Sequence, residues 1–254
     1  MTPSLRKLLF ETLYRNKYLY RFASTVPFAG QWRTWQRLVL PRLRGKDVLE
    51  IGCGLGDLLA DMLDAGYNCH AVESSPQMVA AARETLQKRA AGSPSLIILG
   101  QAQGLSFSSA SFDTVVSTFP SDYIYEPDTI AEIARVLRPG GRLIVIEGAN
   151  LLAVGFFQPV LLLIHLLVYG TGTLFTPGKK RNPSDAAERN GQQRPSHIQV
   201  VPLTRETGTG TTTEQVNDAS FGTHIPLESC GLRRTSEIVR SRRWEVYITL
   251  GEKV

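Results

Sequence analysis

Three glycines at alternate positions follow a short apolar segment near residue 50. Gly52, Gly54 and Gly56 come directly after Asp47–Ile51, and a helical pattern begins beyond them. Glycines in such a place let the backbone turn sharply and approach a ligand closely at the carboxyl edge of the first strand of a sheet. The loop therefore predicts a nucleotide-like ligand, which several classes of enzyme share.

Two carboxylates flank this loop and narrow the choice of ligand. Glu50, two residues before the first glycine, suits a cationic group such as an amine and would repel a pyrophosphate. Glu73 ends the second predicted strand, about twenty residues beyond the glycines, where a carboxylate accepts two hydrogen bonds from a ribose diol. An ordinary exposed acid is the alternative for Glu73. The dehydrogenase fingerprint G-x-G-x-x-G needs glycine at position 57, where this chain has Asp57, so a nicotinamide-dependent oxidoreductase is disfavoured.

A repeated strand–helix pattern positions these residues. The predicted strands are 47–51, 68–73, 96–99, 114–118, 142–147, 234–239 and 245–250. The predicted helices are 56–65, 75–90, 129–137 and 225–230, the second capped by Ser75 with Pro76 in its first turn. The pattern predicts a Rossmann-like, doubly wound α/β fold with a mostly parallel seven-stranded sheet whose last strand is antiparallel.

Residues 46–147 resemble the class I S-adenosylmethionine-dependent methyltransferases, and most closely the branch that includes the ubiquinone and menaquinone biosynthesis enzymes. Four blocks carry the resemblance in the expected order: VLEIGCGLG (48–56), VESSPQMVAAAR (72–83), SFDTVVSTF (111–119) and EIARVLRPGGRLIVIE (132–147). The resemblance implies S-adenosylmethionine as cofactor. A methionine amino group would then be the cation that Glu50 receives.

The resemblance also implies a role for individual residues. The loop from Gly52 through Cys53 to Gly56 would line the methionine and ribose, and Glu73 would hold the ribose hydroxyls. The adenine would lie beside Ser74, Met78, Gln101 and Ala102. Gln101 replaces the acid of the family's G-D-A segment, so its amide oxygen still accepts a hydrogen bond but the contact loses its charge. The backbone of Ser117, Thr118 and Phe119 would lie near the transferable methyl.

The methyl acceptor is less clearly marked in the sequence. Asp122, Tyr123 and Tyr125 follow the fourth predicted strand and either position the acceptor or pack the loop. This loop has no N-P-P-Y-like motif, which argues against methylation of a base amino group. Tyr20 is a candidate for a lid over the cofactor, and His224 either reaches the site or packs at the surface. No motif indicates a metal site.

Two segments depart from the simple fold. Residues 1–45 predict two amphipathic helices, broken near Pro27 and Gly30, that form a lid; the domain itself covers 46–254. An insertion spans 148–223, with an uncharged part, 148–178, and a polar part, 179–220, predicted to be disordered. Its apolar run Leu151–Tyr169 either contacts a membrane surface or packs as a lid or against a second subunit of a homodimer. A single crossing is disfavoured, because the strands that follow must rejoin the sheet.

Charge and cysteine content suggest partners and compartment. Residues 1–46 hold ten Lys or Arg and one acid, and a second basic group comprises Arg233, Arg234, Arg240, Arg242 and Arg243. Such clusters indicate either an anionic partner or a solvated face. The three cysteines lack zinc or disulfide spacing, which fits a reducing compartment such as the cytoplasm, and the first 20 residues do not resemble a signal peptide.

We therefore expect a methyltransferase acting on a small or lipophilic acceptor, such as a quinone-like ring, a lipid headgroup or a secondary metabolite. An RNA or protein methyltransferase, and a cofactor-binding partner subunit without turnover, are the alternatives. Nucleic acid is the less favoured partner, because no residue pattern beyond the charge supports it.

Overall fold

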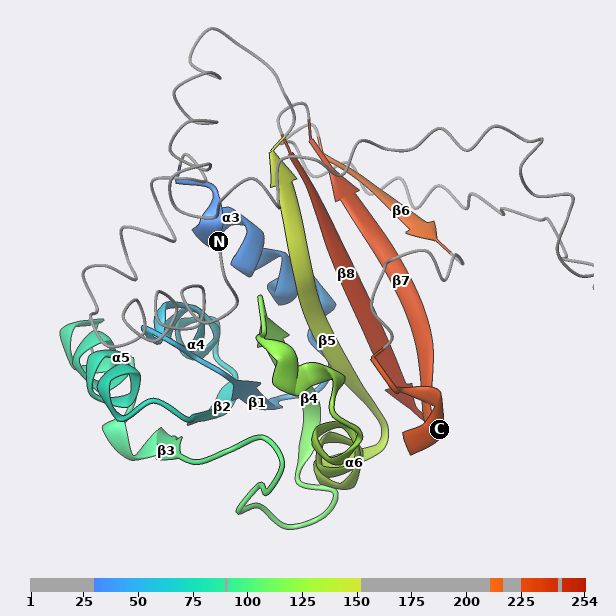
Figure 1. Ribbon diagram of the computed structural model, residues 1–254. Helices are drawn as coiled ribbons and strands as arrows, with labels where there is room; N and C mark the ends of the chain where they lie inside the picture. The colour runs from blue at the N-terminus through green and yellow to red at the C-terminus, as the bar shows by residue number, and fades with distance from the viewer. Residues whose placement is uncertain (1–29, 90, 152–210, 217–224, 242–243) are drawn as a thin grey trace, which may run out of the picture.

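The computed structural model describes residues 30–89, 91–151, 211–216, 225–241 and 244–254 (Figure 1). Their strands form one sheet in the order β3-β2-β1-β4-β5-β8-β7-β6. The first five of these strands in spatial order run parallel: β1 (Asp47–Ile51), β2 (Asn68–Glu73), β3 (Ile97–Leu99), β4 (Phe112–Thr118) and β5 (Leu137–Leu151). Because these strands start and end in the same sense, their carboxyl ends share one edge of the sheet, where ligands bind in open α/β folds.

The remaining strands extend the sheet beyond β5. They are β6 (Thr212–Val216), β7 (Leu232–Arg240) and β8 (Trp244–Lys253), and β8 pairs antiparallel with β5. The predicted antiparallel last strand is thereby confirmed. The predicted helix 225–230 is only a three-residue 3-10 helix, η6 (Glu228–Cys230), which precedes β7 and ends at Gly231 in the left-handed conformation.

Helices cover both faces of the sheet (Figure 1). One face packs against α3 (Trp32–Gln36), η1 (Arg37–Arg42), α4 (Asp57–Asp64) and α5 (Pro76–Arg89). The opposite face packs against α6 (Pro127–Val136) and η6, with the short 3-10 helix η3 (Asp122–Tyr125) leading into α6. A further 3-10 helix, η2 (Pro94–Leu96), leads into β3. Alternate residues of β1 point to opposite faces: Val48 belongs to the first apolar cluster, and Leu49 and Ile51 to the second.

The structure differs from the sequence-based expectation at the edge of the sheet. Residues 212–216 form β6, which pairs antiparallel with β7, so the sheet has eight strands where seven were expected. The prediction of disorder for 179–220 is therefore wrong over these residues, because composition does not reveal a pairing partner distant in the chain. The strand β5 also continues to Leu151, four residues beyond its predicted end and into the start of the predicted insertion.

The described part of the N-terminal segment is helical, as expected. Trp32–Gln36 and Arg37–Arg42 form α3 and η1, and Trp35 is fully buried against the sheet. Residues 1–29 and most of the apolar run Leu151–Tyr169 lie outside the described residues. Within the described residues, no helix combines the length and apolarity needed to cross a bilayer.

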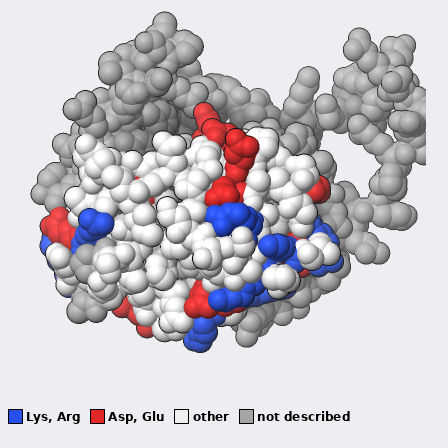
Figure 2. Space-filling model, turned by 90° about the horizontal axis from the view of Figure 1, so that it is seen from below, with Lys and Arg blue, Asp and Glu red and all other residues white. Residues whose placement is uncertain are grey.

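Charged side chains of both signs lie beside one another on the face shown in Figure 2. The described arginines of the C-terminal basic group are ion-paired: Arg233 with Glu252, Arg234 with Glu228, and Arg240 with Glu214 and Glu245. Arg242 and Arg243 lie outside the described residues. Pairing within the protein leaves these three arginines less available to an anionic partner than the sequence suggested.

Candidate cofactor site

The glycine loop forms a tight bend between β1 and α4. Gly52, Gly54 and Gly56 all have positive φ, at 76°, 54° and 75°. Gly52 donates its backbone N–H to the carbonyl of Val72 over 2.8 Å, which fixes the loop against β2. A Cβ on Gly56 would lie 2.9 Å from the Cβ of Ala82, so α5 packs directly on the loop. The backbone therefore needs glycine here both for its conformation and for close packing.

Glu73 lies at the end of β2 with its carboxylate turned toward this loop. One oxygen accepts the N–H of Gly54 at 3.0 Å and the other accepts the N–H of Ser75 at 2.9 Å. The residue is 7% exposed. A carboxylate has about four lone-pair sites, so two hydrogen bonds leave acceptor capacity for a ribose diol. The geometry fits the role that the sequence predicted.

Glu50 is a buried acid near the carboxyl end of the interior strand β1. It is 1% exposed, and among the described residues its Oε2 has no hydrogen-bond partner. The pKa of Glu50 is raised to about 8: burial has the largest effect, Arg33 opposes it, and the carboxylates of Glu73, Asp57 and Asp61 add to it. Such a group is neutral in a dry site and ionises when a cation arrives, which suits the amino group of a methionine moiety.

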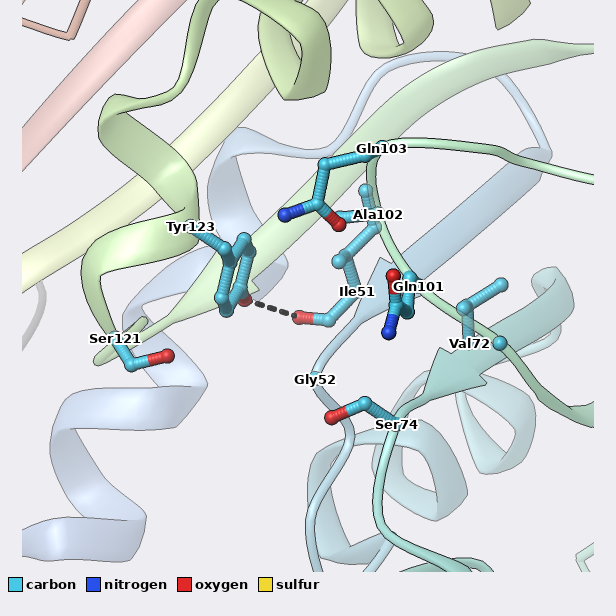
Figure 3. Close-up of a pocket in the computed structure, with 10 residues that line it drawn as sticks. Ile51, Gly52, Val72, Ser74, Gln101, Ala102, Gln103, Ser121 and Tyr123 are labelled. Carbon is cyan, nitrogen blue, oxygen red and sulfur yellow. Dashed lines mark hydrogen bonds between the residues drawn. The ribbon is translucent and has the colours of Figure 1, made fainter. Parts of the chain in front are cut away.

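A cavity of about 230 Å³ opens above these residues at the carboxyl edge of the sheet (Figure 3). Its lining comes from the ends of β1 and β2, the loop after β3, and the start of η3: Ile51, Gly52, Val72, Ser74, Gly100, Gln101, Ala102, Gln103, Ser121 and Tyr123. The predicted adenine-side residues Ser74, Gln101 and Ala102 thus meet in one cavity. Gln103 joins them and donates to the carboxylate of Glu126 over 2.6 Å.

Two predicted cofactor residues lie behind the loop. Met78 is 1% exposed and packs with Leu55 and Ala81. Cys53 is buried, and burial raises the pKa of its thiol well above the usual value. Both side chains pack inside the protein behind the glycine loop, and neither is among the residues that line the cavity.

Of the three acceptor-side candidates Asp122, Tyr123 and Tyr125, only Tyr123 lines the cavity. Its hydroxyl lies 2.7 Å from the Ser117 hydroxyl and 3.3 Å from the Ile51 carbonyl. Asp122 is exposed on η3, and Tyr125 packs against the apolar cluster below α6. Tyr20 and His224, the other candidates, lie outside the described residues.

The end of β4 meets the N-terminal helix through aromatic rings. Phe119 has a φ of 51°, an unusual conformation for a residue with a side chain. Its ring stacks on Trp32 with centroids 4.1 Å apart and lies 6.2 Å from the ring of Trp35. Gln36 also donates to the Thr118 hydroxyl over 3.4 Å. Strained residues held by their surroundings gather at functional sites, and this one lies beside the predicted methyl position.

Sequence reasoning missed the contribution of α3 to this site. The sequence predicted an amphipathic helix after Gly30, but nothing local indicated where it would dock. A buried carboxylate fixes the position: Asp61 of α4 pairs with Arg33 at 2.6 Å, Arg37 at 2.8 Å and Arg89 at 2.8 Å. These arginines hold the pKa of Asp61 below its usual value, although burial opposes them.

The described residues contain no group of three His, Cys, Asp or Glu side chains placed to hold a metal ion. A cofactor of the S-adenosylmethionine type fits the site instead. The buried, unpartnered oxygen of Glu50 calls for a cation, the carboxylate of Glu73 has free acceptor sites, and the glycine loop leaves room for a ligand backbone.

Comparison with known proteins agrees with this geometry. A methyltransferase-domain family matches residues 49–145. A demethylmenaquinone methyltransferase of Symbiobacterium thermophilum is 31% identical over 220 residues, covering 79% of this chain and 82% of that protein. A ubiquinone/menaquinone biosynthesis C-methyltransferase of Dinoroseobacter shibae is 29% identical over 138 residues, so this chain spans about half of that relative.

Among solved structures, a protein of Pyrococcus horikoshii is similar with a TM-score of 0.52 over 92% of this chain and 99% of that chain. Its identity to this chain is 18%, so the likeness concerns the fold.

Proposed function

Because this chain belongs to the class I S-adenosylmethionine-dependent methyltransferases, we propose that it methylates a lipophilic aromatic acceptor of the quinol type. S-adenosylmethionine, when bound, supplies a methyl group made electrophilic by its sulfonium. The contribution of the protein is to hold cofactor and acceptor in line and to keep water away, and these two effects provide much of the rate enhancement in group transfer.

The Trp32–Phe119 pair carries the proposal for the acceptor. Both side chains are half-buried, and they stack at the end of β4, where the methyl is expected. Flat aromatic surfaces favour another ring in offset or edge-to-face contact, at about 0.5–1.5 kcal/mol per pair. An acceptor with an electron-rich ring would lie against this surface. A phosphorylated headgroup would find no matching charge from these two rings.

The relatives support the same class of acceptor. The Symbiobacterium thermophilum relative is named for demethylmenaquinone and the Dinoroseobacter shibae relative for C-methylation in ubiquinone and menaquinone biosynthesis. For this chain we infer transfer to a ring carbon of a reduced, demethylated quinone. The ring gains the methyl and loses a proton, while the sulfonium becomes a thioether.

The test is a methyl-transfer assay with the purified full chain. We expect a methylated product from a short-tailed demethylated naphthoquinol, and none from its oxidised quinone or from phosphoethanolamine. Mass spectrometry of the product locates the methyl on carbon or oxygen. Methylation of another acceptor and not of the quinol would refute the proposal, while calorimetric binding of S-adenosylhomocysteine to the same sample would show that the cofactor site is intact.

Contact with a membrane surface, a homodimer and a cytoplasmic location stay predictions from the sequence. The first two depend mainly on residues 152–169, outside the described residues. Co-sedimentation of the full chain with anionic vesicles tests the first, and light scattering tests the second.

A further inference from the structure

Tyr123 reaches from η3 to the end of β1, across the cavity. Its hydroxyl contacts the Ile51 carbonyl and the Ser117 hydroxyl, and Ser117 in turn donates to the same carbonyl over 3.1 Å. The ring points toward Ile51 from the side opposite Gln101 (Figure 3). A Cβ built on Gly52 would lie 2.9 Å from this hydroxyl. Tyr123 therefore stands directly over the first glycine of the loop.

The order of the strands shows which part of the cofactor lies there. Adenine-side residues follow β3, and the ribose-binding carboxylate of Glu73 ends β2. The next strand is β1 and the one after it is β4. In S-adenosylmethionine the sulfur is attached to the ribose on the side away from the base. A ligand that runs from β3 to β4 would thus carry its sulfur above the end of β1, where the Tyr123 hydroxyl lies.

We propose that Tyr123 serves the cofactor rather than the acceptor, by presenting its hydroxyl oxygen to the positively charged sulfonium. A phenol has one O–H donor and two acceptor lone pairs. Tyr123 lines the cavity, and with its donor directed to Ser117 or Ile51 its phenol oxygen acts as an acceptor. The hydroxyl is held by its neighbours in advance, so little reorganisation is needed when the charge arrives.

The consequence is a preference between two ligands that differ at one atom. S-adenosylmethionine carries a charged sulfonium and S-adenosylhomocysteine a neutral thioether. A lone pair facing the sulfur stabilises the first more than the second, because an ion–dipole attraction is strong where water is excluded. A purely structural hydroxyl would affect both ligands equally.

The experiment measures the binding of both compounds to Tyr123→Phe by calorimetry, without any acceptor. We expect the dissociation constant of S-adenosylmethionine to rise about 3- to 10-fold and that of S-adenosylhomocysteine to change less than 2-fold. An analogue with an ammonium group in place of the sulfonium methyl should follow S-adenosylmethionine. The inference rests on the family's cofactor and not on the quinol proposal, so either can fail alone.

Tyr67→Phe is the matched control. Tyr67 precedes β2 at the opposite edge of the sheet, under Lys46, and its hydroxyl should not influence either ligand. Thermal unfolding of the ligand-free variants verifies that both are folded. Equal weakening of the two ligands would assign Tyr123 a structural role, and tighter binding of both would make it an obstruction; either result overturns the proposal.

Discussion

The backbone N–H of Gly54 donates a hydrogen bond of 3.0 Å to the carboxylate of Glu73. This bond joins the loop after β1 to the end of β2. The other carboxylate oxygen accepts from Ser75 over 2.9 Å, so the group is oriented before any ligand binds. One side chain thus shapes the glycine loop and is held in the orientation that the predicted ribose contact requires.

Replacing Glu73 by alanine should weaken the binding of S-adenosylhomocysteine about 10- to 150-fold. Hydrogen bonds to a charged group contribute about 1.5–3 kcal/mol each, and the loop loses its anchor as well. Calorimetry measures the effect, and Glu84→Ala on the outer side of α5 is the control. Unchanged affinity of the Glu73→Ala variant would remove Glu73 from the site.

Gly52→Ala should abolish measurable cofactor binding at a modest cost in stability. The left-handed φ of 76° costs an alanine about 1–2 kcal/mol, and its Cβ would also press on the Tyr123 hydroxyl. Gly66→Ala is a matched control, since Gly66 has a φ of 82° with nothing within 4 Å of an added Cβ. Urea unfolding should show a loss of stability in both variants, and calorimetry a loss of binding only in Gly52→Ala. If Gly52→Ala bound the cofactor as well as Gly66→Ala does, the ligand would not approach Gly52.

Local sequence predicted the part of the site that local structure builds. Gly52, Glu50 and Glu73 lie at strand ends whose order follows from the repeated strand–helix pattern. The stack of Trp32 on Phe119 joins residues 87 positions apart and depends on how α3 docks, which no local pattern encodes. The burial of Glu50 likewise follows from the neighbours that surround β1.

The edge of the sheet was harder to predict for a related reason. β6 is polar, and it is stabilised by backbone hydrogen bonds to β7 about twenty residues away. Its composition resembled that of a disordered segment, because pairing, and not apolar burial, orders it. In the sequence, Asp122, Tyr123 and Tyr125 were equally good candidates for the site. The turn of η3 directs only Tyr123 into the cavity.

The stability of the ligand-free protein should fall as the pH rises from about 5 to 8. The pKa of Glu50 is raised by burial from 4.5 to about 8, so the folded state holds a proton that the unfolded state has lost. The stabilising contribution is complete below pH 4.5 and is lost as the pH passes 8. Glu50→Gln should be the more stable protein at pH 8, by about 1–4 kcal/mol.

Urea unfolding at pH 5, 6.5 and 8 checks this expectation, with Glu84→Gln as a control that should follow the wild type. The cofactor should show the opposite preference: its ammonium favours an ionised Glu50, so wild-type affinity should increase toward pH 8 and Glu50→Gln should bind weakly throughout. The same pH dependence in wild type and Glu50→Gln would mean that Glu50 does not titrate in this range.

Trp32→Ala should impair the use of an aromatic acceptor while sparing the cofactor. Trp32 stacks on Phe119 at 4.1 Å but does not line the cavity that holds the cofactor residues. We expect kcat/KM for the quinol to fall about 3- to 10-fold, in line with the loss of one aromatic contact. The dissociation constant of S-adenosylhomocysteine should change less than 2-fold. Trp32→Phe keeps a ring at this position and should restore most of the activity. If Trp32→Ala weakened cofactor binding as much as it slowed methyl transfer, α3 would instead act by supporting the glycine loop, and the aromatic surface would lose its assigned role in acceptor recognition.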